Sequence, residues 1–118
     1  MIQELRIGNW IMGELGNEMT VCSLYKNSIE CDFDGGWCSV FCPKPIPLSK
    51  EILEKCGFSF KPIGEEAYEQ FWILDGFTVW QHDKGFCHDY HHGGNIFYLH
   101  DLQNLYYALT KQELEYKP

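Results

Sequence analysis

The stretch "AYEQFWILDGFTVWQHD" (Ala67–Asp83) carries the strongest local structural pattern in the chain. Two runs rich in aromatic and β-branched residues, Tyr68–Leu74 and Phe77–Gln81, flank Asp75-Gly76, the pair that a two-residue type I′ turn prefers. The stretch therefore predicts a β-hairpin. Large apolar side chains occur on both faces of its first run, so either both faces are covered or one of them offers an aromatic patch.

The N-terminal part of the chain reads as short strands separated by turns. The runs "LRIGNWIM" (5–12), "EMTVCSLY" (18–25) and "SIECDF" (28–33) are separated by glycine- and asparagine-containing turns. In the third run Ile29, Cys31 and Phe33 alternate at the two-residue period of a half-buried strand. We expect a three-stranded antiparallel meander here.

A short helix is predicted in the middle of the chain. The closely spaced prolines of "PKPIPLSK" (43–50) force an extended connection, and Ser49 then provides a helix cap. Ile52, Leu53 and Cys56 form an apolar stripe, and Gly57 supplies a left-handed stop. The helix is short, so packing must hold it.

The stretch "HDLQNLYYALTKQEL" (100–114) predicts a closing helix. Its apolar residues recur at the i, i+3, i+4 and i+7 spacing of a helix stripe, and Asp101 suits the positive N-terminal end. Thr110 and Glu113 have capping-box spacing, which predicts that the pattern restarts there. The inward-facing set is expected to be Leu102, Leu105, Leu109 and Leu114.

These elements together predict a single α+β domain over residues 1–118. The domain combines a small, twisted antiparallel sheet with one short middle helix and one C-terminal helix, and its first strands are expected to curl like an SH3-type barrel. A length of 118 residues and an aromatic content of 16% support burial of one core without covalent cross-links.

Charge and cysteine content bear on partners and compartment. The formal net charge is −8, and a field of that sign repels phosphate backbones, so we expect no direct nucleic-acid binding. Charged Glu4 and Arg6 interrupt what a signal peptide would need as an apolar run, and no run approaches the length of a membrane span. We therefore expect a cytoplasmic protein, without membrane contact, whose six cysteines are reduced.

Three blocks of the sequence resemble a known group of proteins. The blocks are "ELRIGNWI" (4–11), "PIPLSKEILEKCGF" (45–58) and "YLHDLQNLYYALTKQEL" (98–114). As a set they resemble a family of small proteins of unknown function from Bacteroides-type gut bacteria and their phages and mobile elements. The resemblance implies a phage or mobile-element setting and the fold, and it implies no activity for named residues.

One group of side chains has the chemistry of a zinc site. Thiolate and imidazole are the ligands that zinc prefers. The spacing is imperfect, because two cysteines four residues apart on an extended strand place their sulfurs about 13 Å apart. We favour core cysteines and solvated loop histidines, with a zinc-binding module or metal-dependent enzyme as the alternative. The candidate ligands are Cys38, Cys42, Cys87, His88, His91 and His92.

No catalytic residue or bound cofactor is predicted otherwise. Cys87 precedes His88, but neighbours on a strand point to opposite faces, and nothing marks an oxyanion hole. The glycine pairs at 35–36 and 93–94 lack the strand–loop–helix order that surrounds a phosphate. We therefore expect a protein that is not an enzyme.

Aromatic residues supply the preferred functional surface, because exposed tryptophan and tyrosine form binding hot spots. The candidate partner-binding residues are Trp72, Trp80, Tyr90 and Tyr107. We expect an accessory protein that binds another macromolecule, a protein, through an aromatic and acidic surface. The outward edge of the closing helix would also suit a homodimer. A second alternative is an acidic DNA mimic that inhibits host defence, which requires acids in a row at the phosphate repeat.

Overall fold

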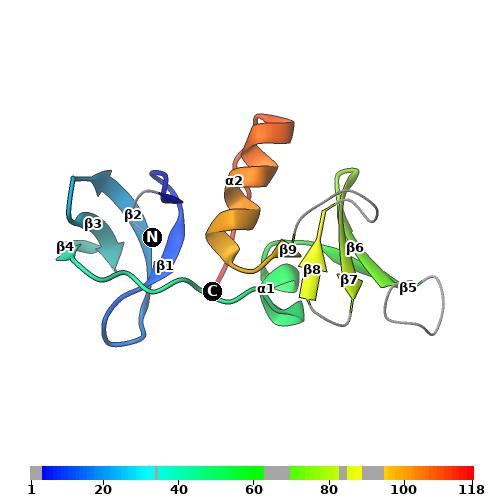
Figure 1. Ribbon diagram of the computed structural model, residues 1–118, viewed down its shortest axis with the longest axis horizontal. Helices are drawn as coiled ribbons and strands as arrows, with labels where there is room; N and C mark the ends of the chain where they lie inside the picture. The colour runs from blue at the N-terminus through cyan, green and yellow to red at the C-terminus, as the bar shows by residue number, and fades with distance from the viewer. Residues whose placement is uncertain (1–3, 34, 63–69, 83–84, 89–94) are drawn as a thin grey trace. The chain divides into compact units, whose positions relative to one another are not determined.

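The computed structural model describes residues 4–33, 35–62, 70–82, 85–88 and 95–118 (Figure 1). The chain forms two compact units, each built from separate parts of the sequence. The first unit combines Met1–Pro47 with Tyr98–Gln112, and the second combines Leu48–Phe97 with Glu113–Pro118. We expected a single domain over residues 1–118. Whether the two units form one domain depends on how they associate, so this expectation stays a prediction.

The predicted α+β class is confirmed, with two antiparallel sheets and two helices in the described residues. The first sheet has the order β1 (Trp10–Met12), β2 (Glu18–Leu24), β3 (Ile29–Phe33) and β4 (Gly36–Val40). The second sheet has the order β5 (Ser59–Pro62), β6 (Gln70–Leu74), β7 (Phe77–His82), β8 (Gly85–Cys87) and β9 (Asn95–Ile96). The helices are α1 (Lys50–Lys55) and α2 (Leu99–Thr110).

The first sheet is the predicted meander with β4 added as a fourth strand. Its inner face follows the two-residue period, because Met19 and Val21 on β2 and Ile29 and Cys31 on β3 are all buried. Register pairs Val21 with Cys31, which places both strands' apolar sets on one face. The core of this unit is completed by Leu5, Ile11 and Val40.

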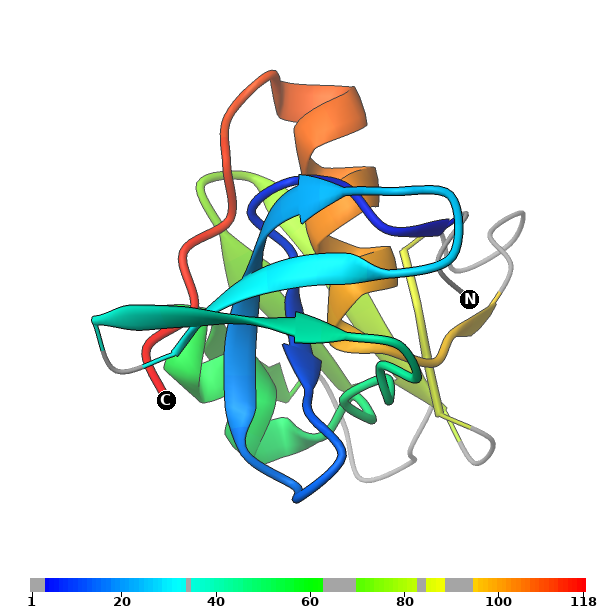
Figure 2. The same ribbon diagram turned by 90° about the vertical axis from the view of Figure 1, so that its left-hand side faces the viewer.

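The first sheet is strongly twisted, and it is open rather than a closed barrel among the described residues. Figure 2 faces this sheet and shows the strand direction turning from β2 to β4. One antiparallel bridge joins Met12 at the end of β1 to Lys44 beyond β4. In it each backbone N–H donates to the other residue's carbonyl, at 2.8 and 2.9 Å. An SH3-like curl therefore stays a prediction.

The hairpin of the second unit is confirmed. Asp75 (φ 48°) and Gly76 (φ 83°) both adopt positive φ, as a type I′ turn requires, and register pairs Leu74 with Phe77 across the turn. Trp72 and Val79 pair further along the hairpin, and both side chains are buried. The middle of one face of this hairpin is thus buried.

The short helix α1 has the predicted caps. The Ser49 hydroxyl accepts from the backbone N–H of Ile52 at 3.2 Å, and Ile52 and Leu53 are buried. Gly57 (φ 93°) reverses the chain, and the N–H of Phe58 then donates to the Leu53 carbonyl at 3.0 Å. Local signals therefore fix both ends of this helix.

The helix α2 is present, but its predicted inward face is partly wrong. Leu102 is buried as expected, whereas Leu105 is half-buried and Leu109 is 56% exposed. The buried stripe keeps the helical spacing but lies three residues earlier along the chain. It consists of Leu99, Leu102, Gln103 and Tyr106, with His100 beside them. The shift arises because polar residues occupy part of the buried face.

The predicted restart of the helix at Thr110 is also wrong. Lys111 adopts the left-handed conformation (φ 62°) and ends α2, and the chain beyond it contains no helix. The Thr110 hydroxyl donates to the Tyr106 carbonyl at 2.7 Å and accepts from the N–H of Gln112 at 3.1 Å. The threonine thus closes the helix instead of starting another, and Leu114 is buried in the second unit.

Two side chains of α2 bind the backbone of the N-terminal segment. The Trp10 N–H donates to the Gln103 side-chain oxygen at 2.8 Å, and the Gln103 amide donates to the Gly8 carbonyl at 3.3 Å. The Asn104 amide donates to the Glu4 carbonyl at 2.9 Å. The helix therefore supplies partners to backbone groups that no strand pairs.

A third amide joins this arrangement from the N-terminal segment itself. The amide of the fully buried Asn9 donates to the Asn104 side-chain oxygen at 2.9 Å, and its own oxygen accepts from the Arg6 N–H at 2.7 Å. The Arg6 guanidinium also donates to Asn104 and lies 4.6 Å from the centre of the Tyr107 ring. We call Asn9, Gln103 and Asn104 the amide network.

Leu102 and Leu109 provide a direct test of the α2 face. Leu102→Ala should lower the free energy of unfolding by about 2 to 5 kcal/mol, because it empties a fully buried site. Leu109→Ala should change it by less than about 0.5 kcal/mol, because that side chain is exposed. Urea titration of both variants measures the difference, and equal losses would contradict this assignment of the buried face.

Gln103 provides a test of the amide network. Gln103→Ala leaves the Trp10 N–H and the Gly8 carbonyl without their partner and should cost roughly 1 to 3 kcal/mol of stability. The exposed Gln112, just beyond the helix, serves as the matched control, and Gln112→Ala should stay within about 0.5 kcal/mol of the unchanged protein. Thermal and urea unfolding of the two variants give the comparison.

Candidate functional site

The first unit contains an open apolar groove of about 480 Å³ at one end of its sheet. Met19, Cys38 and Val40 belong to the inner face of the sheet, so the groove continues the buried core toward solvent. The groove is lined by Glu14, Leu15, Asn17, Met19, Phe33, Cys38, Ser39, Val40 and Phe41. Its polar groups are few beside its apolar ones, which is typical of binding sites.

Large apolar side chains stand exposed around this groove. Leu15, in the turn between β1 and β2, is 95% exposed, and Phe41, after β4, is 65% exposed. Phe33 at the end of β3 is also exposed. Single exposed apolar residues are ordinary, but three around one groove form a patch of the kind that marks interaction sites.

The strand β4 forms an edge of the first sheet beside this groove. Among the described residues its sheet neighbour is β3 alone. Its sequence, Gly36–Val40 ("GWCSV"), contains no charge and no proline, the usual features that protect an edge from pairing with another chain. The edge is therefore suited to accept a further strand.

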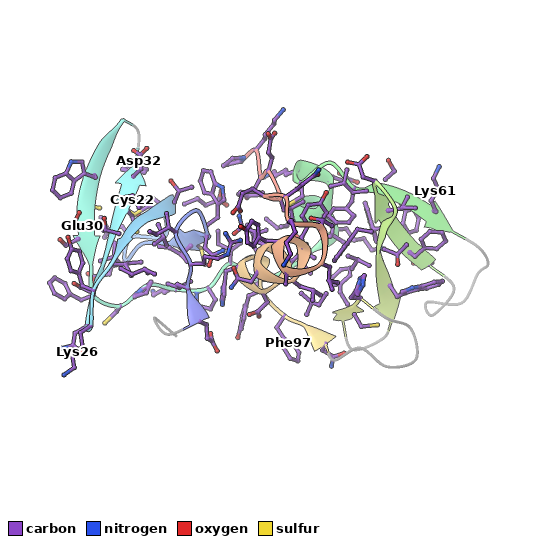
Figure 3. All side chains as sticks on the ribbon, turned by 90° about the horizontal axis from the view of Figure 1, so that it is seen from above. Cys22, Lys26, Glu30, Asp32, Lys61 and Phe97 are labelled. Carbon is purple, nitrogen blue, oxygen red and sulfur yellow. The ribbon has the colours of Figure 1, made fainter. Side chains whose placement is uncertain are left out.

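The outer face of the same sheet is aromatic and acidic. Trp37 on β4 is 70% exposed and pairs with Asp32 on β3. The Tyr25 hydroxyl donates to the Glu30 carboxylate at 2.9 Å, and this bond and the carboxylate charge raise the pKa of Tyr25 above its ordinary value. Figure 3 labels Glu30 and Asp32 with Cys22 on the two neighbouring strands.

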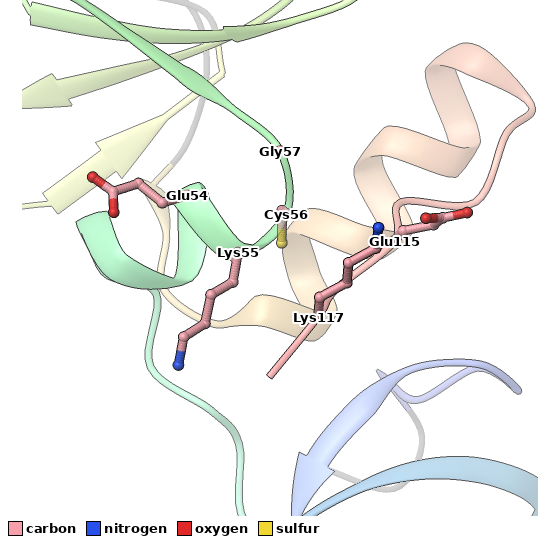
Figure 4. A pocket seen from close by; sticks show the side chains of 6 residues that line it. All are labelled: Glu54, Lys55, Cys56, Gly57, Glu115 and Lys117. Atoms are coloured by element: carbon pink, nitrogen blue, oxygen red, sulfur yellow. The ribbon is translucent and has the colours of Figure 1, made fainter.

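The second unit has a smaller pocket, of about 200 Å³, beside α1 (Figure 4). Figure 4 shows Glu54 and Lys55 of the helix with Glu115 and Lys117 of the C-terminal segment. The two acidic and two basic side chains that line this pocket cancel in charge. The Lys117 backbone N–H donates to the Lys55 carbonyl at 3.1 Å. The pocket thus marks where the C-terminal segment is attached, and it offers no convergent binding groups.

The structure corrects one of the predicted partner-binding aromatics. Trp72 is only 2% exposed and packs against Phe60, with ring centres 5.0 Å apart, so its place on a binding surface is wrong. Trp80 is half-buried, and its ring lies 4.9 Å from that of Phe71. Tyr107 is exposed beneath Arg6, and Tyr90 lies outside the described residues.

The predicted zinc ligands are distributed over both units. Cys38 and Cys42 are exposed in the first unit, whereas Cys87 is buried and His88 half-buried in the second. His91 and His92 lie outside the described residues. The convergence of these six side chains on one metal stays a prediction.

His88 has a defined hydrogen-bonded state in the second unit. Its Nδ1 lies 2.8 Å from the Thr78 carbonyl, and since a carbonyl only accepts, Nδ1 carries the proton. The ring also stacks on Phe77 with ring centres 4.3 Å apart. Only Nε2 is therefore left as a metal-binding atom of this histidine.

A different polar cluster, which the sequence did not predict, is formed by Glu4, His100 and Asp101 in the first unit. His100 is fully buried, and neither of its ring nitrogens has a hydrogen-bond partner. A buried group in that state costs about 1 to 3 kcal/mol. The adjacent His100-Asp101 pair was visible in the sequence, but Glu4 comes from the other end of the chain, so no local spacing indicated the cluster.

The six cysteines are free thiols of two kinds. Cys22, Cys38 and Cys42 are exposed, whereas Cys31, Cys56 and Cys87 are buried. Burial raises the pKa of the Cys56 thiol to about 12, and burial together with the neighbouring Cys38 and Cys22 raises that of Cys31 to about 12. The reactive thiolate form of these two residues is therefore suppressed at neutral pH.

Comparison with known proteins found no matching family model, no similar curated protein and no similar solved structure. Neither helix in the described part of the chain is long and apolar enough to cross a membrane. The resemblance of the three sequence blocks stays a prediction.

Thiol labelling should separate the two kinds of cysteine. With iodoacetamide at pH 8, Cys22, Cys38 and Cys42 should be alkylated first because they are exposed. Cys31 and Cys56 should react only after unfolding, because a pKa of about 12 keeps them protonated. Peptide mass spectrometry over time measures the order, and early alkylation of Cys31 would contradict its placement in the core.

Proposed function

We propose that the protein is a non-enzymatic accessory protein that binds another protein through its first unit. The bound partner contributes an extended segment that pairs with the β4 edge and places apolar side chains in the groove. The observation that carries this proposal is the coincidence of an unprotected edge strand with exposed Leu15, Phe33 and Phe41 around one groove.

The mode of binding follows from strand geometry. A strand added to a sheet edge gains main-chain hydrogen bonds, and its alternate side chains point to one face. Here one face is the apolar groove, while the other carries Trp37 and Asp32. A bound segment should therefore alternate apolar residues with residues that suit an aromatic and acidic surface.

Charge favours a basic segment. The chain has seventeen acidic against nine basic residues, and Glu14, Glu30 and Asp32 stand on the groove or the outer face of this sheet. Opposite charge on the partner would accelerate association and fix its orientation. The three resembling blocks add a phage or mobile-element context to this proposal, and the cytoplasmic location expected from the sequence is also part of it.

The DNA-mimic alternative is less well supported. Glu30 and Asp32 stand on one face of β3 at the two-residue repeat of about 7 Å that imitation of phosphates requires. Across from them stand Ser39 and Trp37 on β4 and Ser23 and Thr20 on β2. The acidic row on β3 is therefore two residues long, and its aromatic neighbour suits protein recognition better.

The experiment selects short random peptides displayed on phage against the purified protein. We expect enriched sequences in which apolar residues alternate with lysine or arginine. Bound peptide should slow hydrogen exchange of the amides in Gly36–Val40, since those amides join a new strand. Selection that yields no peptide, or protection confined to the second unit, would refute the proposal.

Matched surface variants locate the binding site. Leu15→Ser and Phe41→Ser should each weaken peptide binding at least about tenfold, because both side chains line the groove. Ile7→Ser removes an exposed apolar side chain of the same unit away from the groove and should leave binding unchanged. Native mass spectrometry is the second readout, because a stable dimer lost on Phe41→Ser would make a second copy the occupant.

A further inference from the structure

A second site, independent of the groove, lies where the N-terminal segment meets the start of α2 in the first unit. The His100 Nε2 atom is 3.4 Å from the Glu4 Oε2 atom and 3.3 Å from the Asp101 Oδ1 atom. All three atoms lie within 4.8 Å of one another. One imidazole and two carboxylates thus converge on one point.

The buried histidine is what distinguishes this cluster from a group of surface acids. The His100 side chain is fully buried, yet neither ring nitrogen has a hydrogen-bond partner in the described residues. The ring is held by the parallel Tyr98 ring, with centres 5.7 Å apart and planes 6° apart. Its Nε2 atom therefore faces the two carboxylates without a hydrogen-bond partner among the described residues.

The spacing matches a metal centre better than a hydrogen bond. With metal–ligand distances of about 2.0 to 2.2 Å, neighbouring ligands of a tetrahedral ion lie about 3.3 to 3.6 Å apart. The two distances from His100 fall in this range, the two carboxylates lie within 4.8 Å of each other, and neither contact of His100 qualifies as a hydrogen bond. The glutamate is also positioned, because the Asn104 amide donates to its carbonyl at 2.9 Å.

The ligand set identifies the class of ion. Magnesium and calcium prefer oxygen ligands alone, whereas zinc accepts imidazole together with carboxylates. The two carboxylates also bring two negative charges to the site, which a divalent cation neutralises. Both acids are needed, since the positive end of α2 opposes a cation at this position.

We propose that Glu4, His100 and Asp101 bind a divalent transition-metal ion of the zinc type. The three side chains supply three ligands, which leaves a fourth position for water. The ion links the N-terminal segment to α2 and stabilises the first unit. This site shares no residue with the predicted Cys/His group.

The test measures Zn²⁺ binding to the full-length, chelator-treated protein by calorimetry. We expect binding of one ion and a rise of the melting temperature on adding Zn²⁺. Glu4→Gln and Asp101→Asn replace exposed side chains and should each weaken binding by about tenfold or more, because each removes a charged ligand. Asp32→Asn, which removes the same charge from the outer face of the sheet, is the control and should bind as before.

Two further outcomes separate this site from the alternatives. The Co²⁺-loaded protein should lack a thiolate-to-cobalt charge-transfer band, and Cys38→Ser with Cys42→Ser should keep full affinity. Such a band, or affinity lost with the cysteines but retained in Glu4→Gln and Asp101→Asn, would overturn the assignment and favour the Cys/His group. Failure of the unchanged protein to bind Zn²⁺ would overturn it as well, without affecting the groove proposal.

Discussion

The first unit depends on the paired hydrogen bonds of Gln103, a buried carboxamide that serves the backbone of a segment more than ninety residues away. Apolar contacts are non-directional, so by themselves they leave α2 some freedom to slide or rotate against β1. The carboxamide removes that freedom, because any other register would bury the Trp10 N–H, the Gly8 carbonyl and the Gln103 side chain without partners. The hydrogen bond between the Asn9 and Asn104 side chains holds the N-terminal segment against α2 at a second place.

The proposed metal cluster depends on the same contacts between α2 and the N-terminal segment. His100 and Asp101 precede Gln103 by one helical turn or less, so they are placed by the same helix register. Asn104 holds the Glu4 carbonyl and thereby brings the third ligand to the helix. A change that shifted α2 along its axis would thus separate the ligands before it exposed much of the core.

Patterns within a few residues predicted the second unit's hairpin and α1, because Asp75-Gly76, Ser49 and Gly57 each act on the backbone locally. The closing helix and its helical spacing were predicted correctly, but the face of the helix that is buried was not. The apolar spacing favoured Leu105 and Leu109, whereas the folded unit buries His100 and Gln103 against the N-terminal segment, at the far end of the chain. No local pattern contains that information, and Trp72 was misplaced similarly because its cover comes from another strand.

The difference between local patterns and contacts made across the chain also bears on the three sequence blocks that resemble a known family. The blocks at residues 4–11 and 98–114 contain the whole amide network and all three proposed metal ligands. Relatives that shared these two blocks would therefore be expected to keep the contacts between α2 and the N-terminal segment, together with the proposed metal ligands. The three blocks do not include the exposed apolar residues of the groove, Leu15, Phe33 and Phe41. Recognition at the β4 edge can therefore differ between proteins that share the contacts of α2 with the N-terminal segment. The proposed resemblance therefore concerns the scaffold of the first unit, and it carries no information about a partner bound at the groove.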